Sequence, residues 1–220
     1  VTWNGGSGVR IRIRRILIPV FYCLAIACLI EVPLGQTDLF GEAVILWDTL
    51  FRAILAVPVL YYFYQEDAVF RGEKRWDLRA FFLSFGAGAG LSALSFFLMR
   101  AAGVSAMEEA GKTLFTGELW LQLLVLLIAS PLLEEFFFRG VLYGRLKELL
   151  SVPGAAVVSS AFFGLYHGNW IQGIYGFFMG LFLSAAMERC RTVKAPVIMH
   201  LAANGAALFL NAIVNAAVSP

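Results

Sequence analysis

The chain has 220 residues, of which 60% are hydrophobic and only 15% are charged, whereas soluble domains carry about 25% charged residues. A soluble fold of this length could not bury so much apolar surface, so the composition excludes an ordinary soluble domain. The formal net charge of +2 gives no electrostatic basis for binding nucleic acid.

Apolar runs need about 20 residues each to cross about 30 Å of hydrocarbon as helices. We predict membrane helices over residues 16–32, 43–64, 80–99 and 119–138, two helices within 154–187 interrupted near Gly168–Asn169, and a last helix over 195–218. No run shows the alternating ten-residue pattern of membrane β-strands. The sequence therefore predicts an all-α, polytopic transmembrane bundle of about seven helices.

Four arginines, Arg10, Arg12, Arg14 and Arg15, precede the first predicted helix. Short loops rich in Arg and Lys stay on the cytoplasmic side, and the later basic loops fall on the same side as this one. We therefore expect a multi-pass membrane protein with a cytoplasmic N-terminus. A cleaved secretory signal is the alternative for the first segment, which we expect to be retained as a helix.

Two units are predicted along the chain. Residues 1–110 supply three membrane helices and a charged segment, 65–79, in which Phe70 and Trp76 favour a position at the membrane interface. Residues 111–220 carry the polar residues on which a function can be argued, and they form the predicted catalytic core.

The fourth predicted helix carries an acidic pair, Glu134 and Glu135, followed by Arg139. An ionisable group at the centre of a membrane helix costs roughly 2.5–3.5 kcal/mol on insertion scales, so such groups are functional candidates. Glu135 and Arg139 are four residues apart and can pair on one helix face. That pairing would leave Glu134 free to act on water as a general base. The alternative is that both acids mark a helix end at the lipid headgroups.

Two further patterns contain both histidines of the chain. Phe163 and His167 lie one turn apart in a glycine-rich helix, where a histidine can equally be a packing residue. His200 and Asn204 project from one face of the last helix, where they can hold an oxyanion or form an interhelical hydrogen-bonding pair. The coincidence of the patterns favours a shared site.

Other polar and aromatic residues receive a structural interpretation. Asp48 and Arg52, also four residues apart, are expected to neutralise one another. An aromatic-rich group could hold a lipid or an apolar peptide, and we expect at least half of it to face lipid instead. It consists of Phe136, Phe137, Phe138, Phe162, Phe163, Tyr166 and Trp170.

The three patterns, in this order, resemble those of the CAAX protease and bacteriocin-processing family, the Abi or Rce1-like intramembrane proteases. The family motifs Glu-Glu-x-x-x-Arg, Phe-x-x-x-His and His-x-x-x-Asn stand here at residues 134–139, 163–167 and 200–204. The resemblance covers about residues 119–211, the last four predicted helices, and nothing specific is matched by the first three.

The resemblance implies an endopeptidase that acts on a membrane-associated or lipidated peptide or protein. Glu134 and His167 would activate a water molecule, and His200 with Asn204 would hold the oxyanion. The implied supporting residues are Glu135, Arg139 and Phe163. No cofactor is favoured.

Alternatives remain at this stage. A zinc-dependent version would use Glu134, His167 and His200 as ligands, since a catalytic zinc commonly takes three protein ligands and a water. We favour the metal-free version because Glu134 cannot easily serve as both ligand and base. A transporter or proton-relay protein and a non-catalytic bacteriocin-immunity protein are the rivals from other classes.

The predicted orientation also sets a geometric condition on the site. His200 lies only a turn or two beyond Lys194, whereas Glu134 lies farther from Lys147. The two residues can meet only if the fourth helix continues well past Arg139, or if a wet cavity reaches into the bundle.

Overall fold

The computed structural model describes residues 5–101 and 118–218, and every regular element within these ranges is a helix. The predicted all-α class is therefore confirmed. The predicted boundary between residues 110 and 111 lies outside the described residues. The elements are α1 (Gly5–Leu34), η1 (Gly41–Ala43), α2 (Val44–Glu66), α3 (Ala68–Arg71), α4 (Leu78–Ala101), α6 (Leu119–Leu124), η2 (Val125–Ala129), α7 (Ser130–Glu135), η3 (Phe136–Tyr143), α8 (Gly144–Leu146), α9 (Val152–Tyr166), α10 (Trp170–Cys190) and α11 (Lys194–Val218).

Within the described ranges, six helices are long and apolar enough to cross a membrane. The remaining helix of the seven predicted, α9, is apolar but has only 15 residues. At 1.5 Å per residue it is about 22 Å long, which is short of the about 30 Å of hydrocarbon. The polytopic bundle is confirmed, but α9 is too short to span the hydrocarbon alone.

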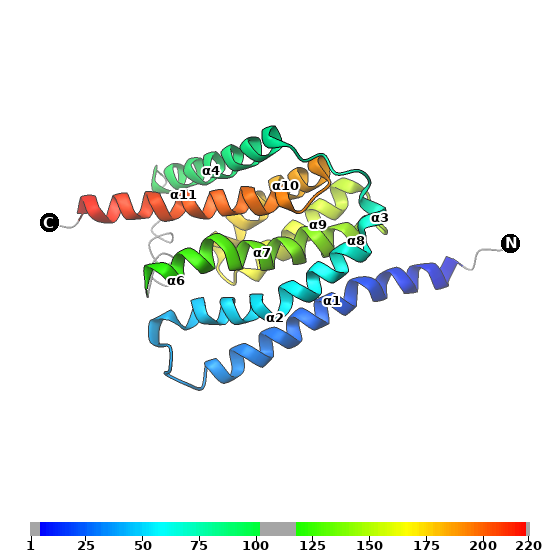
Figure 1. The fold of residues 1–220 in the computed structure, drawn as a ribbon, viewed down its shortest axis with the longest axis horizontal. Coiled ribbons are helices and arrows are strands. Elements are labelled where there is room, and N and C mark those ends of the chain that lie inside the picture. The colour runs from blue at the N-terminus through cyan, green and yellow to red at the C-terminus, as the bar shows by residue number, and fades with distance from the viewer. Residues whose placement is uncertain (1–4, 102–117, 219–220) are drawn as a thin grey trace.

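Elements α6 to α8 form one continuous helix, residues 119–146, which we call the central helix. Figure 1 shows it running through the bundle between α2 and α11. In its apolar window, 67% of the residues are buried inside the molecule, against 11–33% for the other five spans. The central helix therefore forms the core, and the other helices shield it from lipid.

Two parts of the central helix, η2 and η3, are π-helical. The wider turns of a π-helix are rare and often occur beside functional sites. Here they flank α7, which carries the acidic pair, and the helix continues through η3 to Leu146. The predicted end at residue 138 is thus wrong, and the condition that the helix extend well past Arg139 is met.

Close helix contacts are made through glycines. A Cβ built at Gly88 of α4 would lie 1.9 Å from the Met199 carbonyl oxygen of α11, so these two helices touch backbone to backbone. A Cβ at Gly164 of α9 would lie 2.5 Å from the Gly173 carbonyl oxygen of α10. Small residues permit this approach in membrane bundles, and it holds α9 and α10 together as a hairpin.

The turn of this hairpin falls at the predicted interruption. Gly168 has φ +64°, in the left-handed region that glycine adopts without steric cost. The Asn169 side chain then caps α10 by accepting from the backbone N–H groups of Ile171 (3.0 Å) and Gln172 (3.2 Å).

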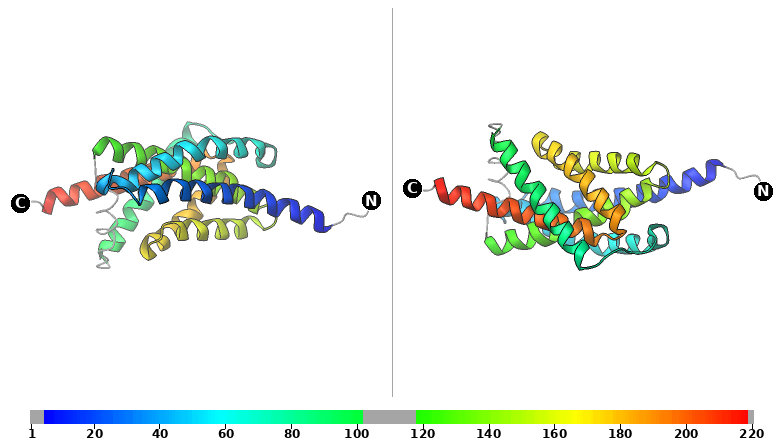
Figure 2. Two further views of the ribbon diagram at one scale, coloured as in Figure 1. Left: turned by 90° about the horizontal axis from the view of Figure 1, so that it is seen from below. Right: turned by 90° about the horizontal axis from the view of Figure 1, so that it is seen from above.

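One end of the bundle gathers the basic loops, and we call it the basic end. It holds the first turns of α1, α3 with the loop that follows, the end of the central helix, and the end of α10 (Figure 1). Arg145 donates to Asp67 (2.7 Å), and Arg15 bonds both Asp67 and Glu148. The two views in Figure 2 show the ends of α1 and α11 projecting from opposite ends of the bundle.

Candidate active site

The site is centred on Glu135 of α7 and Arg139 of η3. Both side chains are completely buried, and Arg139 Nη1 lies 3.1 Å from Glu135 Oε1. The i,i+4 pair predicted from the sequence is therefore formed. The guanidinium carbon of Arg139 also lies 4.1 Å from the centroid of the Phe163 ring, a cation–π contact that helps to hold a charge away from water.

Glu134 has different hydrogen-bond partners from this pair. Its Oε1 accepts from Ser130 Oγ at 2.5 Å, while its Oε2 lies 3.9 Å from His200 Nε2, too far for a direct hydrogen bond. Oε2 is buried and has no hydrogen-bond partner among the residues described. Buried polar atoms are nearly always paired, so a carboxylate oxygen left in this state is ready to bind a water or substrate hydrogen.

His200 of α11 lies between the two acids. Its Nδ1 is 2.7 Å from Glu135 Oε1. Because Glu135 is paired with Arg139 as a carboxylate, Nδ1 carries the hydrogen and donates it. This bond fixes the ring and leaves Nε2 directed toward Glu134.

His167 follows the last residue of α9. Its Nδ1 donates to the Phe163 carbonyl oxygen at 2.8 Å, so in the neutral ring Nε2 is free to accept. A Cβ built at Gly176 would lie 3.3 Å from this ring, which shows how closely α10 passes.

Phe163 lies between the two histidines. Its ring centroid is 4.9 Å from that of His167 and 5.9 Å from that of His200. Within the described ranges, no hydrogen bond or ion pair joins His167 to Glu134 directly. The structure thus brings Glu134, Glu135, Arg139 and His200 into contact and links His167 to them through Phe163.

Asn204 lies one turn beyond His200 on α11. Its Nδ2 donates to the Leu126 carbonyl oxygen of η2 at 2.8 Å. The amide nitrogen carries two hydrogens, so one remains available after this bond. Asn204 therefore joins α11 to the central helix as well as standing on the face of the site.

The zinc alternative would use Glu134, His167 and His200 as ligands. The described residues contain no group of three His, Cys, Asp or Glu side chains placed to hold a metal ion. Glu134 and His200 approach one another, while the Nδ1 of His167 is engaged by its own helix. The Nε2 of His167 stays free, and metal dependence stays a prediction.

A cavity of about 510 Å³ opens beside Glu134, between α1, α2, the central helix and α9. Its charged lining residues are Glu134 and Arg52, and the rest of the wall is largely apolar. Arg52 pairs with Asp48 as predicted. Representative wall residues are Ile16, Val20, Leu133, Phe137, Phe162 and Tyr166.

The aromatic group divides between core and surface. Phe162, Tyr166 and Trp170 are exposed, and the first two line the cavity. Exposed side chains can face lipid or the cavity, so the expectation that at least half of the group faces lipid stays a prediction. The core members are Phe136, Phe138 and Phe163, while Phe137 is half-buried.

Sequence reasoning missed two contributors to the site. Ser130 stands four residues before Glu134, so the spacing rule that paired Glu135 with Arg139 also indicates the Ser130–Glu134 hydrogen bond. Gly180 of α10 leaves room for the buried arginine, since a Cβ there would lie 3.0 Å from Arg139 Nη2. Nothing in the sequence pairs Gly180 with Arg139.

Comparison with known proteins shows which part of the chain resembles a known family. Residues 116–206 match the model of the family described as type II CAAX prenyl endopeptidase Rce1-like. We call residues 116–206, which are similar to this Rce1-like family, the Rce1-like region. The predicted resemblance is thereby confirmed, and all the site residues lie within the matched range.

Two relatives match part of the chain. YdiL of Bacillus subtilis, a candidate membrane peptidase, is 30% identical over 84 residues, which cover 38% of this chain and 34% of YdiL. MroQ of Staphylococcus aureus, a membrane-embedded CAAX protease, is 33% identical over 84 residues, which cover 36% of this chain and 34% of MroQ. The match thus spans about a third of each relative. No solved structure gives a significant match. Since its described residues include six helices long and apolar enough to cross a membrane, the chain is a multi-pass membrane protein.

Proposed function

We propose that this protein is an intramembrane endopeptidase in which Glu134 activates a water molecule. The observation that carries the proposal is the buried Oε2 of Glu134, which has no hydrogen-bond partner among the described residues and lies beside an apolar cavity and His200. A desolvated carboxylate at hydrogen-bond distance from a water is a competent general base.

The reaction follows from the placement of these groups. Glu134 takes a proton from water as the water oxygen attacks the carbonyl carbon of the scissile peptide bond. The carbonyl oxygen becomes an oxyanion, which accepts hydrogen bonds from His200 and from the free hydrogen of Asn204. The C–N bond then breaks, and Glu134 returns the proton to the leaving amine.

His200 can donate to the oxyanion through Nε2 only when both ring nitrogens carry hydrogen. The local charge balance supports this form, because two carboxylates, Glu134 and Glu135, then face two cations, Arg139 and His200, and the buried cluster is neutral. His167, with its Nδ1 bound to Phe163, presents Nε2 as an acceptor that holds the attacking water in place.

The cavity supports an apolar substrate. Its volume of about 510 Å³ lies within the range of ligand pockets, and its largely apolar wall suits a lipid chain or a hydrophobic peptide segment. The proposed substrate is a membrane-associated or lipidated peptide or protein. The family description and the name of MroQ both refer to CAAX proteolysis, which supports this class.

The metal-free mechanism predicts that chelators leave cleavage unchanged. Incubation of the purified protein with a strong zinc chelator, followed by the peptide assay, should give the untreated rate. Loss of activity that added zinc restores would overturn the glutamate mechanism in favour of the zinc alternative.

Glu134→Gln tests the base directly, because the amide keeps the shape of the side chain but accepts no proton. We expect cleavage of membrane-anchored and prenylated peptides to fall by about 100- to 10,000-fold, measured by mass spectrometry of the products in detergent. The matched control is Glu73→Gln in an exposed loop, which should retain the parental rate. Undiminished cleavage by Glu134→Gln would remove this residue from its proposed role.

We also propose that the basic end faces the cytoplasm of a bacterial plasma membrane, because positively charged short loops are retained there. Labelling of single cysteines introduced at Glu73 and at Asp38, in loops at opposite ends of α2, tests this in whole cells once the three native cysteines have been replaced by alanine. A membrane-impermeant reagent should modify the cysteine at position 38 and spare the one at position 73.

A further inference from the structure

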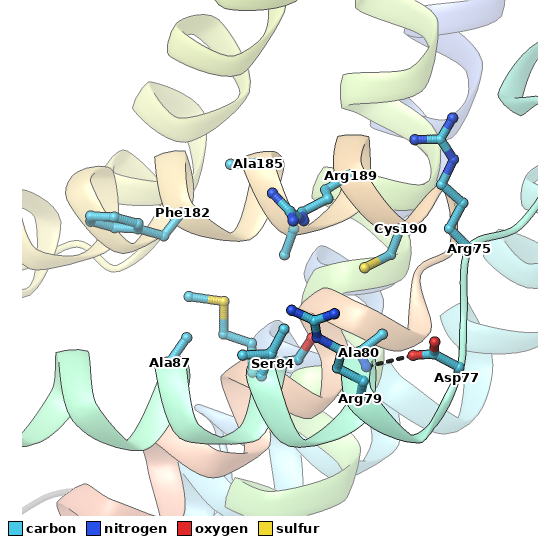
Figure 3. Close-up of a pocket in the computed structure, with 13 residues that line it drawn as sticks. Arg75, Asp77, Arg79, Ala80, Ser84, Ala87, Phe182, Ala185, Arg189 and Cys190 are labelled. Atoms are coloured by element: carbon cyan, nitrogen blue, oxygen red, sulfur yellow. Dashed lines mark hydrogen bonds between the residues drawn. The ribbon is translucent and has the colours of Figure 1, made fainter.

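A second cavity lies between α4 and α10 at the basic end (Figure 3). Its volume is about 660 Å³, against about 510 Å³ for the cavity beside Glu134, and the two have no lining residue in common. The proposed peptidase reaction makes no use of it.

The helices themselves explain why this space exists. α4 is held against α11 where Gly88 meets Met199, and α10 is held against α9 where Gly173 meets Gly164. α4 and α10 therefore face one another across a gap, with Met199 among the residues that line it. Alanines on both helices, including Ala87 and Ala185, leave the gap unfilled (Figure 3).

The rim of this cavity is positively charged. Arg79 of α4 and Arg189 of α10 extend into the gap from opposite sides, and Arg75 lies farther out on the preceding loop (Figure 3). None of these three arginines forms an ion pair within the described ranges. By contrast, Arg145 at the same end is held by Asp67.

The one acid in the lining is already engaged. Asp77 Oδ1 accepts from the backbone N–H of Ala80 at 2.7 Å, a bond that caps the start of α4. Three arginines and one aspartate give the lining a formal charge of 3 − 1 = +2. The rim therefore presents unsatisfied positive charge to an anion.

Below the rim, apolar residues line the walls on the same helix faces that carry the arginines. Leu83 and Ala87 follow Arg79 at intervals of four, so all three stand on one face of α4. On α10, Ala185 precedes Arg189 by four residues and Phe182 precedes Ala185 by three, so these residues also share one helix face. Charge at the membrane surface and an apolar slot running inward match the head and the chain of a phospholipid.

We propose that this cavity binds one anionic phospholipid, with its phosphate between Arg79 and Arg189 and an acyl chain along Leu83, Ala87 and Phe182. Guanidinium groups bind phosphate oxygens in paired hydrogen bonds, and basic pockets between membrane helices are recognised sites for anionic lipid headgroups. The apolar slot favours such a lipid over free phosphate, because phosphate has no acyl chain to occupy the slot.

The test is lipid retention by the full chain, which is independent of peptidase activity. The protein in non-ionic detergent is titrated with phosphatidylglycerol, phosphatidylcholine or inorganic phosphate and examined by native mass spectrometry. We expect one phosphatidylglycerol to be retained in preference to phosphatidylcholine, with no competition by phosphate. Equal retention of both lipids, or displacement by phosphate alone, would overturn the proposal.

Variants locate the site. Arg79→Gln with Arg189→Gln should weaken phosphatidylglycerol retention by about tenfold or more. The matched control is Arg10→Gln with Arg14→Gln, which removes the same charge from exposed positions at the same end and should retain the lipid. If the control lost phosphatidylglycerol to the same extent, the effect would be one of general charge, and the proposed site would be rejected.

A second variant leaves the charges intact. Ala185→Trp fills the slot from an exposed position on α10 and should reduce retention although all three arginines remain. Unchanged retention by Ala185→Trp would place the lipid elsewhere, whatever the arginine variants show. It also keeps the proposal testable if the double arginine variant fails to fold.

Discussion

Glu135 is the residue on which the buried charges converge. It is completely buried and accepts from both Arg139 (3.1 Å) and His200 (2.7 Å). Breaking a buried pair is costly because the partner left behind keeps a charge that water cannot reach. The residue thus positions His200 by holding its ring, while Glu134, next to it in the chain, stays free for chemistry.

Arg139→Met should therefore destabilise the protein by about 3–5 kcal/mol, seen as a lower melting temperature in detergent. Adding Glu135→Leu removes the stranded carboxylate and should recover part of that loss. Arg14→Met, at an exposed position, is the control and should melt like the parent. A melting temperature unchanged by Arg139→Met would show that the pair contributes no stability.

Residue spacing predicted the part of the site that lies within single helices. The i,i+4 rule paired Glu135 with Arg139 and set Glu134 apart. It could not predict that His200 bonds Glu135, a contact across 65 positions, or that Asn204 reaches the Leu126 carbonyl. Those bonds depend on how α11 packs on the central helix, and no local pattern encodes that packing.

At the scale of elements, the close contact of α4 with α11 shows what glycine provides. Gly88 is buried against Met199, whereas Gly90, half a turn away on the same helix, faces open space. The same substitution at these two positions should consequently act in opposite directions.

Gly88→Ala should lower stability by about 1–3 kcal/mol, because the added carbon forces the two backbones apart. Gly90→Ala should raise it by up to about 1 kcal/mol, because alanine favours the helix. Thermal unfolding of the two variants in the same detergent measures both. Equal melting temperatures would mean that α4 does not touch α11 at Gly88.

Helix positions were predictable from apolar runs, and the interruption at Gly168–Asn169 from its composition. The end of the central helix was not predictable, because Arg139 and Arg145 look like residues at the lipid headgroups. In the structure both are buried, one by Glu135 and the other by Asp67. Because each arginine is paired with an acid inside the bundle, its position in the sequence does not indicate where the helix reaches the membrane surface.

For the molecule as a whole, a charge network at the basic end joins the first helices to the Rce1-like region. Asp67, which follows α2, bonds Arg15 of α1 and Arg145 of α8, and Arg145 also donates to the Arg15 carbonyl oxygen at 2.5 Å. Asp67 and Arg145 are 4% and 3% exposed, so water screens them little. This network fixes α1 and α2 as two walls of the cavity beside Glu134.

Asp67→Asn should leave Arg145 buried without its counter-charge and lower stability by about 3 kcal/mol or more. Peptide cleavage should fall at the same time, because the cavity loses its walls. Asp38→Asn in the exposed loop after α1 is the control and should change neither property. A normal melting temperature for Asp67→Asn would show that the network is not required.

The wide turns of η3 have a further consequence for the geometry of the chain. Every residue of a π-helix advances less around the axis than one of an α-helix, so η3 sets the angular phase between Glu134 before it and Lys147 after it. Lys147 and Tyr143 both reach Glu188 of α10, at 2.6 and 2.9 Å. If those eight residues formed an ordinary α-helix, Lys147 would rotate away from Glu188 while Glu134 stayed in place.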